Sequence, residues 1–167
     1  YGVDCNRVRA AFNEFLHRLP FYGLAVLCVD DPEVRQLAAE MPRHLVTYGF
    51  ADDADVRAVG AHQEAGKTSF RLHLPDTDAF EVCLNLPGRH NVQNALAAAA
   101  VGWQLGVSAA AIRRALERFQ GVGRRFNQLG ELVLRQGKAL LVDDYGHHPR
   151  ELAAIFAAAR AGWPQRR

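Results

Sequence analysis

The chain has 167 residues, of which 49% are hydrophobic and 23% charged, so it can bury a core and form one domain or parts of two. A formal net charge of +2, from 20 basic and 18 acidic residues, excludes a global affinity for nucleic acid or anionic membranes. The 3 cysteines form no CxxC pair, which predicts neither a disulfide framework nor a zinc site and favours a reducing cytoplasm. We expect no signal peptide and no membrane span, because the longest apolar run, 95–103, is short and contains Gly102.

The N-terminal region predicts a helix followed by a strand–helix–strand unit. Apolar residues recur at helical spacing over 4–19, where Pro20 stops the helix. The run 24–29 is typical of a buried strand, and Asp31-Pro32 then supplies an N-cap and a first helical residue. With a second strand over 44–48, this order predicts a parallel α/β sheet.

After residue 52 apolar and polar residues alternate, which is the period of half-exposed strands. Polar turns separate these strands, so we expect a small antiparallel sheet built on Val56, Ala58, Phe70, Leu72, Leu74, Phe80, Val82, Leu84 and Leu86. Helical patterns follow over 91–105, closed by Gly106, and over 109–119, opened by Ser108 as N-cap.

A second unit is predicted after the helical pair, with a domain boundary over 121–126. Strands are expected over 128–134 and 138–142, the latter as a buried strand. Pro149 is well placed as the first residue of a helix over 149–161.

Gly66-Lys67-Thr68-Ser69 looks like the end of a phosphate-binding P-loop. That pattern also needs a glycine at position 61, where the chain has alanine, and Gly60 is one residue out of register. A P-loop joins a buried strand to a helix, whereas this segment joins two alternating strands. We therefore predict a hairpin turn here rather than a phosphate site.

Asn91 and Asn94 lie three residues apart near the start of a predicted helix, so their carboxamides share one face of its first turn. Each carboxamide offers a donor and an acceptor, the pair that matches the N6 and N7 edge of adenine. The alternative is that Asn91 caps the helix and Asn94 meets only solvent. Spacing alone leaves both interpretations open.

Arg124-Arg125 follows the glycines of the predicted domain boundary. Guanidinium groups bind phosphate in bidentate geometry, and hydrogen bonds to charged groups are worth about 1.5–3 kcal/mol each. A phosphate ligand at the boundary is one interpretation, and a solvated pair bonded to backbone carbonyls is the other.

The segment 143–149, Asp-Asp-Tyr-Gly-His-His-Pro, places carboxylates, a phenol and imidazoles between a strand and a helix. Ligands bind at the carboxyl ends of strands in open α/β sheets, so we expect a site here. His147 and His148 are adjacent and point to opposite sides of an extended chain, which argues against one shared metal ion. Asp144 suits a ribose hydroxyl or a cationic partner, or else caps the following helix.

Three segments, in this order, resemble the Mur ligases of bacterial peptidoglycan synthesis: HNVQNALAA at 90–98, FQGVGRRF at 119–126 and VDDYGHHP at 142–149. The blocks 15–23 and 28–32 are similar to the branch of that family that adds L-alanine. They argue against the branch that recycles murein peptides. The resemblance covers nearly the whole chain.

The resemblance implies an α/β fold in two parts. Residues 1–121 would be the later part of a central, P-loop-type ATP-binding domain with its small antiparallel sheet. Residues 122–167 would be the first part of a Rossmann-like C-terminal domain that closes over ATP. We accordingly expect the chain to be a fragment of a longer protein, as Tyr1 at its start and the helix stop over 162–167 also indicate.

The resemblance also implies ligand roles for individual residues. Tyr145 and His147 would lie toward the amino-acid substrate, and Arg125 and His147 would be catalytic. The cofactor-binding residues would be His90, Asn91, Asn94, Arg125 and Asp144.

The implied reaction is ATP-dependent amide formation between UDP-N-acetylmuramate and L-alanine. The carboxylate attacks the terminal phosphate to give an acyl phosphate, and the amine then displaces phosphate. Mg²⁺ would assist, but the family's P-loop and metal ligands match no segment here, so we assign no metal-binding residue. We expect this chain alone to have no ligase activity and at most weak affinity for ATP.

Alternatives from other classes remain open. A non-catalytic adenine-nucleotide-binding module would bind ATP without chemistry, and a scaffold fragment would tolerate replacement of its histidines and Arg125. Within the family, the murein-peptide recycling ligase is the alternative.

Overall fold

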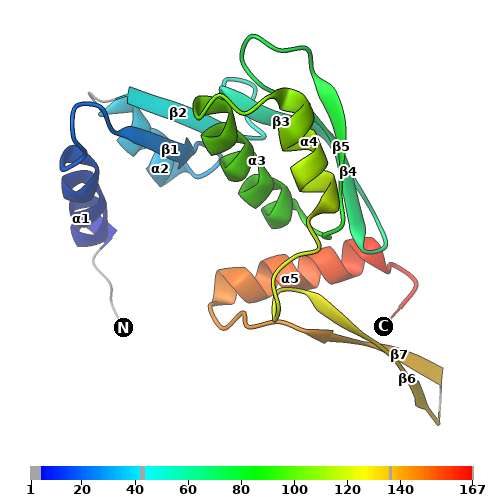
Figure 1. The fold of residues 1–167 in the computed structure, drawn as a ribbon. Coiled ribbons are helices and arrows are strands. Elements are labelled where there is room, and N and C mark those ends of the chain that lie inside the picture. The colour runs from blue at the N-terminus through cyan, green and yellow to red at the C-terminus, as the bar shows by residue number, and fades with distance from the viewer. Residues whose placement is uncertain (1–4, 42–43, 136, 167) are drawn as a thin grey trace.

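A five-stranded mixed sheet forms the larger part of the molecule (Figure 1). The computed structural model describes residues 5–41, 44–135 and 137–166. The strands lie in the spatial order β1-β2-β3-β4-β5, with bounds β1 Leu24–Cys28, β2 His44–Gly49, β3 Val56–Glu64, β4 Lys67–His73 and β5 Phe80–Leu84. Strands β1, β2 and β3 are parallel, whereas β3, β4 and β5 are antiparallel. The predicted parallel unit and the predicted antiparallel strands are confirmed, and both belong to one sheet.

Five helices accompany the strands in the described parts of the chain: α1 Cys5–His17, α2 Pro32–Ala39, α3 Arg89–Gln104, α4 Ala109–Arg118 and α5 Pro149–Gly162. The expected start of α1 at residue 4 lies outside the described residues. The helix ends at His17, before the predicted end at Leu19. Helix α3 begins at Arg89, two residues before the predicted start.

The N-caps predicted at Asp31 and Ser108 are confirmed. The Asp31 carboxylate accepts hydrogen bonds from the backbone N–H groups of Glu33 and Val34 at 2.9 and 3.3 Å, and Pro32 opens α2. The Ser108 hydroxyl accepts from the N–H of Ala111 at 3.4 Å at the start of α4. Both caps satisfy donors that a helix leaves free in its first turn.

The main core lies between the sheet and α3. Val92 and Leu96 on α3 are fully buried against Phe70 and Leu72 on β4. Alternation along the strands sends neighbouring residues to opposite faces. A smaller cluster therefore forms on the other face, where Ala25 packs with the α1 and α2 side chains.

A hairpin and a helix make up the second part of the molecule. Strand β6 Asn127–Leu134 and strand β7 Gly137–Asp143 pair antiparallel, and α5 follows them. The predicted strand over 138–142 is confirmed, but its predicted burial is wrong, because no described residue of β7 is buried. The physical reason is that β7 has a single neighbouring strand.

The β3–β4 connection confirms the hairpin turn predicted at Gly66. Glu64 pairs with Lys67 across it, and Ala65 adopts a left-handed conformation with φ 49°. This turn lies beside the C-terminal half of α5, while the start of α5 lies below the start of α3 (Figure 1). No helix in the described residues is long and apolar enough to cross a membrane.

Candidate functional site

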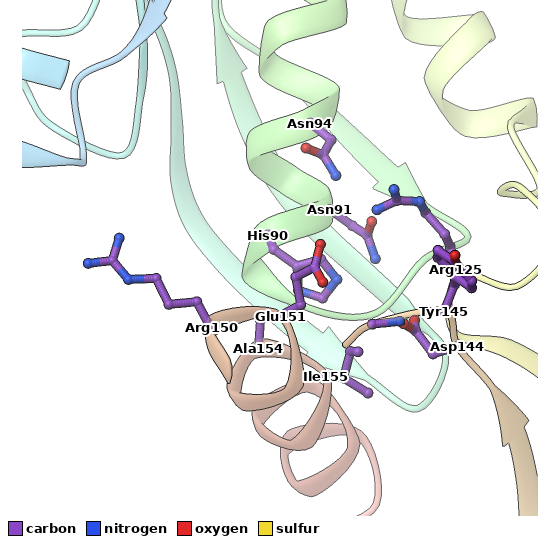
Figure 2. A pocket seen from close by; sticks show the side chains of 11 residues that line it. His90, Asn91, Asn94, Arg125, Asp144, Tyr145, Arg150, Glu151, Ala154 and Ile155 are labelled. Carbon is purple, nitrogen blue, oxygen red and sulfur yellow. The ribbon is translucent and has the colours of Figure 1, made fainter. Parts of the chain in front are cut away.

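A cleft of about 290 Å³ separates the start of α3 from the second part of the molecule (Figure 2). One wall comes from α3 and the other from the segment 119–126 between α4 and β6, the loop after β7 and the first turns of α5. The lining residues are His90, Asn91, Asn94, Arg125, Asp144, Tyr145, Gly146, Arg150, Glu151, Ala154 and Ile155. Six of the seven residues predicted from the sequence are therefore brought together.

The first wall depends on how α3 begins. Its N-cap is Gly88, with φ 96°, and an added Cβ there would lie 2.7 Å from the His90 ring and 2.9 Å from Ala158. Only glycine fits this position without strain. Asn91 is thus not the cap; its Nδ2 instead donates to the Pro87 carbonyl at 2.7 Å.

The carboxamide atoms of Asn91 and Asn94 that face the cleft remain available for a ligand. Asn94 is exposed, and within the described ranges no hydrogen bond engages its side chain. The two carboxamides and the His90 ring extend from α3 toward the opposite wall, as Figure 2 shows. The structure thus excludes the capping role for Asn91 and leaves the ligand role as a prediction.

Asp144 holds the second wall together. Its Oδ2 accepts from the Phe126 N–H at 2.7 Å, and its Oδ1 accepts from the Gly146 N–H at 2.6 Å. The alternative in which Asp144 caps α5 is wrong. His148 is the N-cap, and Glu151 accepts in return from the His148 N–H at 3.1 Å. Carboxylate oxygens have several lone pairs, so Asp144 retains acceptor capacity for a ligand.

The two arginines of the segment between α4 and β6 take different directions. Arg125 lines the cleft, and no hydrogen bond or ion pair within the described ranges occupies its guanidinium. Arg124 instead lies 4.7 Å from the centre of the Tyr145 ring, and its carbonyl accepts from the Tyr145 N–H at 2.8 Å. The solvated-pair alternative therefore fits Arg124 poorly, since it packs on an aromatic ring.

His147 is the predicted site residue that the structure does not bring into the cleft. Its ring lies edge-on to Tyr145, with 5.4 Å between ring centres, and its Nδ1 is 3.1 Å from the Tyr145 carbonyl. The side chain is exposed.

A second, mostly apolar cavity of about 580 Å³ adjoins the cleft and was not predicted. Asn91, Asn94 and Arg125 line both spaces. The other walls are Leu84, Leu86, Ala95, Ala98, Ala115, Leu116, Phe119, Gly121 and Val122. No sequence signal marks this cavity, since β5, α3, α4 and the segments that follow β5 and α4 each contribute only a few residues.

Sequence reasoning missed five residues that line the cleft, Gly146, Arg150, Glu151, Ala154 and Ile155, and also Gly88, which shapes the start of α3. Glu151 completes a capping box, for which the spacing from residue 148 was a signal, although histidine rather than serine or threonine occupies the cap. Gly88 could be assigned a role only once its close approach to α5 was known. No group of three or more histidine, cysteine or acidic residues in the described part of the chain is arranged to hold a metal ion.

Residues 2–102, more than half of the chain, match the family model of the Mur ligase middle domain. The chain belongs to the Mur ligase family. The match ends near the close of α3, so the α3 wall lies within the Mur ligase middle domain and the opposite wall follows it.

Curated relatives place the chain within a longer sequence. It is 64% identical to a UDP-N-acetylmuramate–L-alanine ligase of Stenotrophomonas maltophilia, covering all of this chain and 35% of that protein. A Xanthomonas campestris ligase of the same name is 61% identical over the same share. This Mur ligase chain therefore spans about a third of the length of these relatives.

Solved Mur ligases share the fold. The UDP-N-acetylmuramate-alanine ligase from Thermotoga maritima is 27% identical, with a TM-score of 0.74, over 99% of this chain and 36% of that one. A MurF structure from Acinetobacter baumannii is 29% identical, with a TM-score of 0.72, over 89% of this chain and 32% of that one.

Burial lowers the pKa of His90 from its ordinary value of 6.5; the Asp144 carboxylate opposes this effect, and Arg125 adds to it. A lowered pKa in the folded state means that the neutral ring is favoured. Its stabilising contribution is thus fully present above about pH 6.5 and lost as the pH falls through the folded pKa.

We expect this Mur ligase chain to lose more stability on acidification than its His90→Gln variant, which has no titrating ring at this position. Urea unfolding midpoints measured from about pH 8 to about pH 5 test this expectation. Equal losses in the two proteins would show that His90 is not the group responsible.

Proposed function

We propose that this chain is part of an ATP-dependent ligase that joins L-alanine to UDP-N-acetylmuramate through an acyl phosphate. The observation that supports it most is the apposition of the α3 carboxamides to Arg125 and Asp144 across one cleft. The high identity to ligases of that name points to the substrates.

In this proposal the apolar cavity receives the adenine ring. Its aliphatic and aromatic lining suits a flat base, and the Asn91 and Asn94 carboxamides at its border supply the donor and acceptor for the adenine edge. Because both residues also line the polar cleft, the phosphates would extend from the base into that cleft.

Arg125 is proposed to neutralise charge on the phosphoryl group as it is transferred. Its guanidinium is free of protein partners in the described ranges and borders both spaces. A fixed positive charge of this kind stabilises a phosphoryl-transfer transition state more than the ground state. Mg²⁺ would further neutralise the phosphates, but the described residues form no metal site, so we assign it no step here.

The loop after β7 is proposed to contribute the ribose and amino-acid side of the site. Asp144 retains acceptor capacity for a ribose hydroxyl, although both of its oxygens already accept backbone N–H groups. Tyr145 lines the cleft, and the His147 ring packs edge-on against it. We assign these two aromatic residues to the amino-acid substrate.

The domain division is also a proposal. We assign residues 1–121 to the later part of a central ATP-binding domain and residues 122–167 to the first part of the following domain. The change from the five-stranded sheet to the separate β6–β7 hairpin supports this division. Nucleotide-linked precursors and ATP would place the reaction in the cytoplasm.

The function is tested with the full-length protein, ATP, Mg²⁺, UDP-N-acetylmuramate and L-alanine. Phosphate release that requires both the sugar nucleotide and the amino acid is the expected result. ATP binding by calorimetry without any coupled phosphate release would favour a nucleotide-binding module instead.

Replacing Asn94 with aspartate is expected to weaken ATP binding about tenfold or more, because the carboxylate keeps the size of the side chain but loses its N–H donor. The KM for ATP in the full-length ligase measures the effect. Gln104→Glu is a control for added charge on the same helix, since Gln104 lies at the other end of α3 and lines neither the cleft nor the apolar cavity. An unchanged KM in Asn94→Asp would remove Asn94 from the nucleotide site.

A further inference from the structure

The second wall of the cleft needs something besides its backbone connection to hold it in place. The segment that joins the two parts contains Gly121, with φ 90°, and Gly123, around which a side chain would meet open space. Such a connection permits many orientations of the second part. The contacts that fix one of these orientations lie outside this segment.

Those contacts are made by α5, which packs on α3 and on β3. Ala158 is the buried residue of α5, with an exposed fraction of 3%, and it lies close to Gly88 at the start of α3. An ion pair from Arg150 to Asp31, at 3.5 Å, also joins the two parts. The Arg150 side chain is 87% exposed, so this pair contributes little.

The end of the β3–β4 hairpin provides the directional contact. Gln63 Nε2 on β3 donates to the carbonyl of Ala158 at 2.7 Å and lies 3.4 Å from the carbonyl of Ala65. It joins residues 95 positions apart in the sequence and is partly buried. This carbonyl lies inside a helix, where its second lone pair remains available to a side-chain donor.

Glycine at position 162 is needed for the same approach. A Cβ added there would lie 2.6 Å from the Ala65 carbonyl oxygen and 2.6 Å from Gln63 Nε2. The hairpin therefore meets α5 along its backbone at two points one helical turn apart, Ala158 and Gly162.

We propose that the β3–β4 hairpin is the docking seat of α5 and that Gln63 is a positioning residue for the second wall of the cleft. Helix α5 is continuous and moves as one body. Fixing its C-terminal half on the hairpin therefore also fixes its first turns, where Glu151 and Ile155 line the cleft. Asp144 and Tyr145 precede those turns directly, so the same contact sets their distance from α3. The kinetic consequence rests on the proposed ligase function, whereas the docking itself does not.

Two variants remove the contact in different ways. Gln63→Glu keeps the side-chain size but places a carboxylate against two carbonyl oxygens. Gly162→Ala raises the intrinsic helix propensity of α5 while its Cβ prevents the close approach, so undocking in this variant would not come from loss of the helix. Glu64→Ala is the matched control on the same hairpin, and Gln63→Lys tests whether another donor rescues docking.

Docking is measured in the full-length protein, with its cysteines replaced by serine, as the distance between nitroxide labels at Ala110 on α4 and Ala153 on α5. Both positions are exposed. We expect one narrow distance distribution in the parent and Glu64→Ala. In Gln63→Glu and Gly162→Ala we expect the ratio of displaced to docked molecules to rise about fivefold over the parent. Distributions that stay unchanged in both test variants would overturn the proposal.

The positioning role is read from kinetics of the same variants without labels. We expect kcat/KM to fall in Gln63→Glu in proportion to the docked fraction that is lost, and to recover in Gln63→Lys. A displaced distance with unchanged kcat/KM would overturn the positioning role. Displacement in a protein whose parent shows no ligase activity would instead support docking and reject the proposed function.

Discussion

Replacing Arg125 with alanine in the full-length ligase is expected to lower kcat by about 10³-fold and to raise the KM for ATP by less than about tenfold. The guanidinium borders both the polar cleft and the apolar cavity and has no protein partner within the described ranges. Its charge is therefore available to a ligand. A positive charge that contacts the transferring phosphoryl group contributes mainly in the transition state.

Arg124 offers a matched control for this experiment. It has the same side chain one residue earlier, but its guanidinium packs on the Tyr145 ring and lines neither space. Arg124→Ala is expected to change kcat much less than Arg125→Ala. If Arg125→Ala instead raised only the KM for ATP, the residue would bind the nucleotide equally in both states and the phosphoryl role would be wrong.

Replacing Phe70 with alanine is expected to lower the free energy of unfolding by about 3–5 kcal/mol, which is a large fraction of the stability of a typical domain. Phe70 lies on β4 with an exposed fraction of 1%, in the core formed between the sheet and α3. Truncation would leave a cavity there, because strands and a helix on both sides prevent collapse.

Urea unfolding of this chain and its variants measures the loss. Phe12→Ala is the control, because Phe12 on α1 is 57% exposed and its truncation leaves no cavity; we expect a change below about 1 kcal/mol. A similar small change in Phe70→Ala would mean that the sheet–α3 core does not limit stability. Loss of core packing would also displace α3, which supplies the first wall of the cleft.

Local sequence signals predicted most of the elements because their physics is local. Asp31-Pro32 and Ser108 began helices as expected, since each cap satisfies backbone donors a few residues away. Alternating residues predicted β4 and β5 because one face of each is buried. The buried strand predicted over 138–142 failed on burial alone: apolar composition does not reveal how many neighbours a strand has.

The candidate site was predicted as a set of residues rather than as a geometry. Spacing placed Asn91 and Asn94 on one helical face. The resemblance to Mur ligases assigned Arg125 and Asp144 to the nucleotide and Tyr145 to the amino-acid substrate, and all five residues line the cleft. Residue type and spacing did not separate Arg124 from Arg125, and only the resemblance singled out Arg125. Their different directions follow from the left-handed conformation of Arg124, with φ 61°, and from the Tyr145 ring beside it.

The sequence by itself determined the element types, the N-caps of α2 and α4 and the family, because each depends on residues close together in the chain or on motifs in a fixed order. The tertiary structure alone decided that α5 docks on the β3–β4 hairpin through Gln63 and Gly162, which brings the two walls of the cleft face to face. That contact joins a strand side chain to a helix backbone far along the chain. No local sequence pattern predicts such a contact, since it forms only when the tertiary structure brings β3 and α5 together.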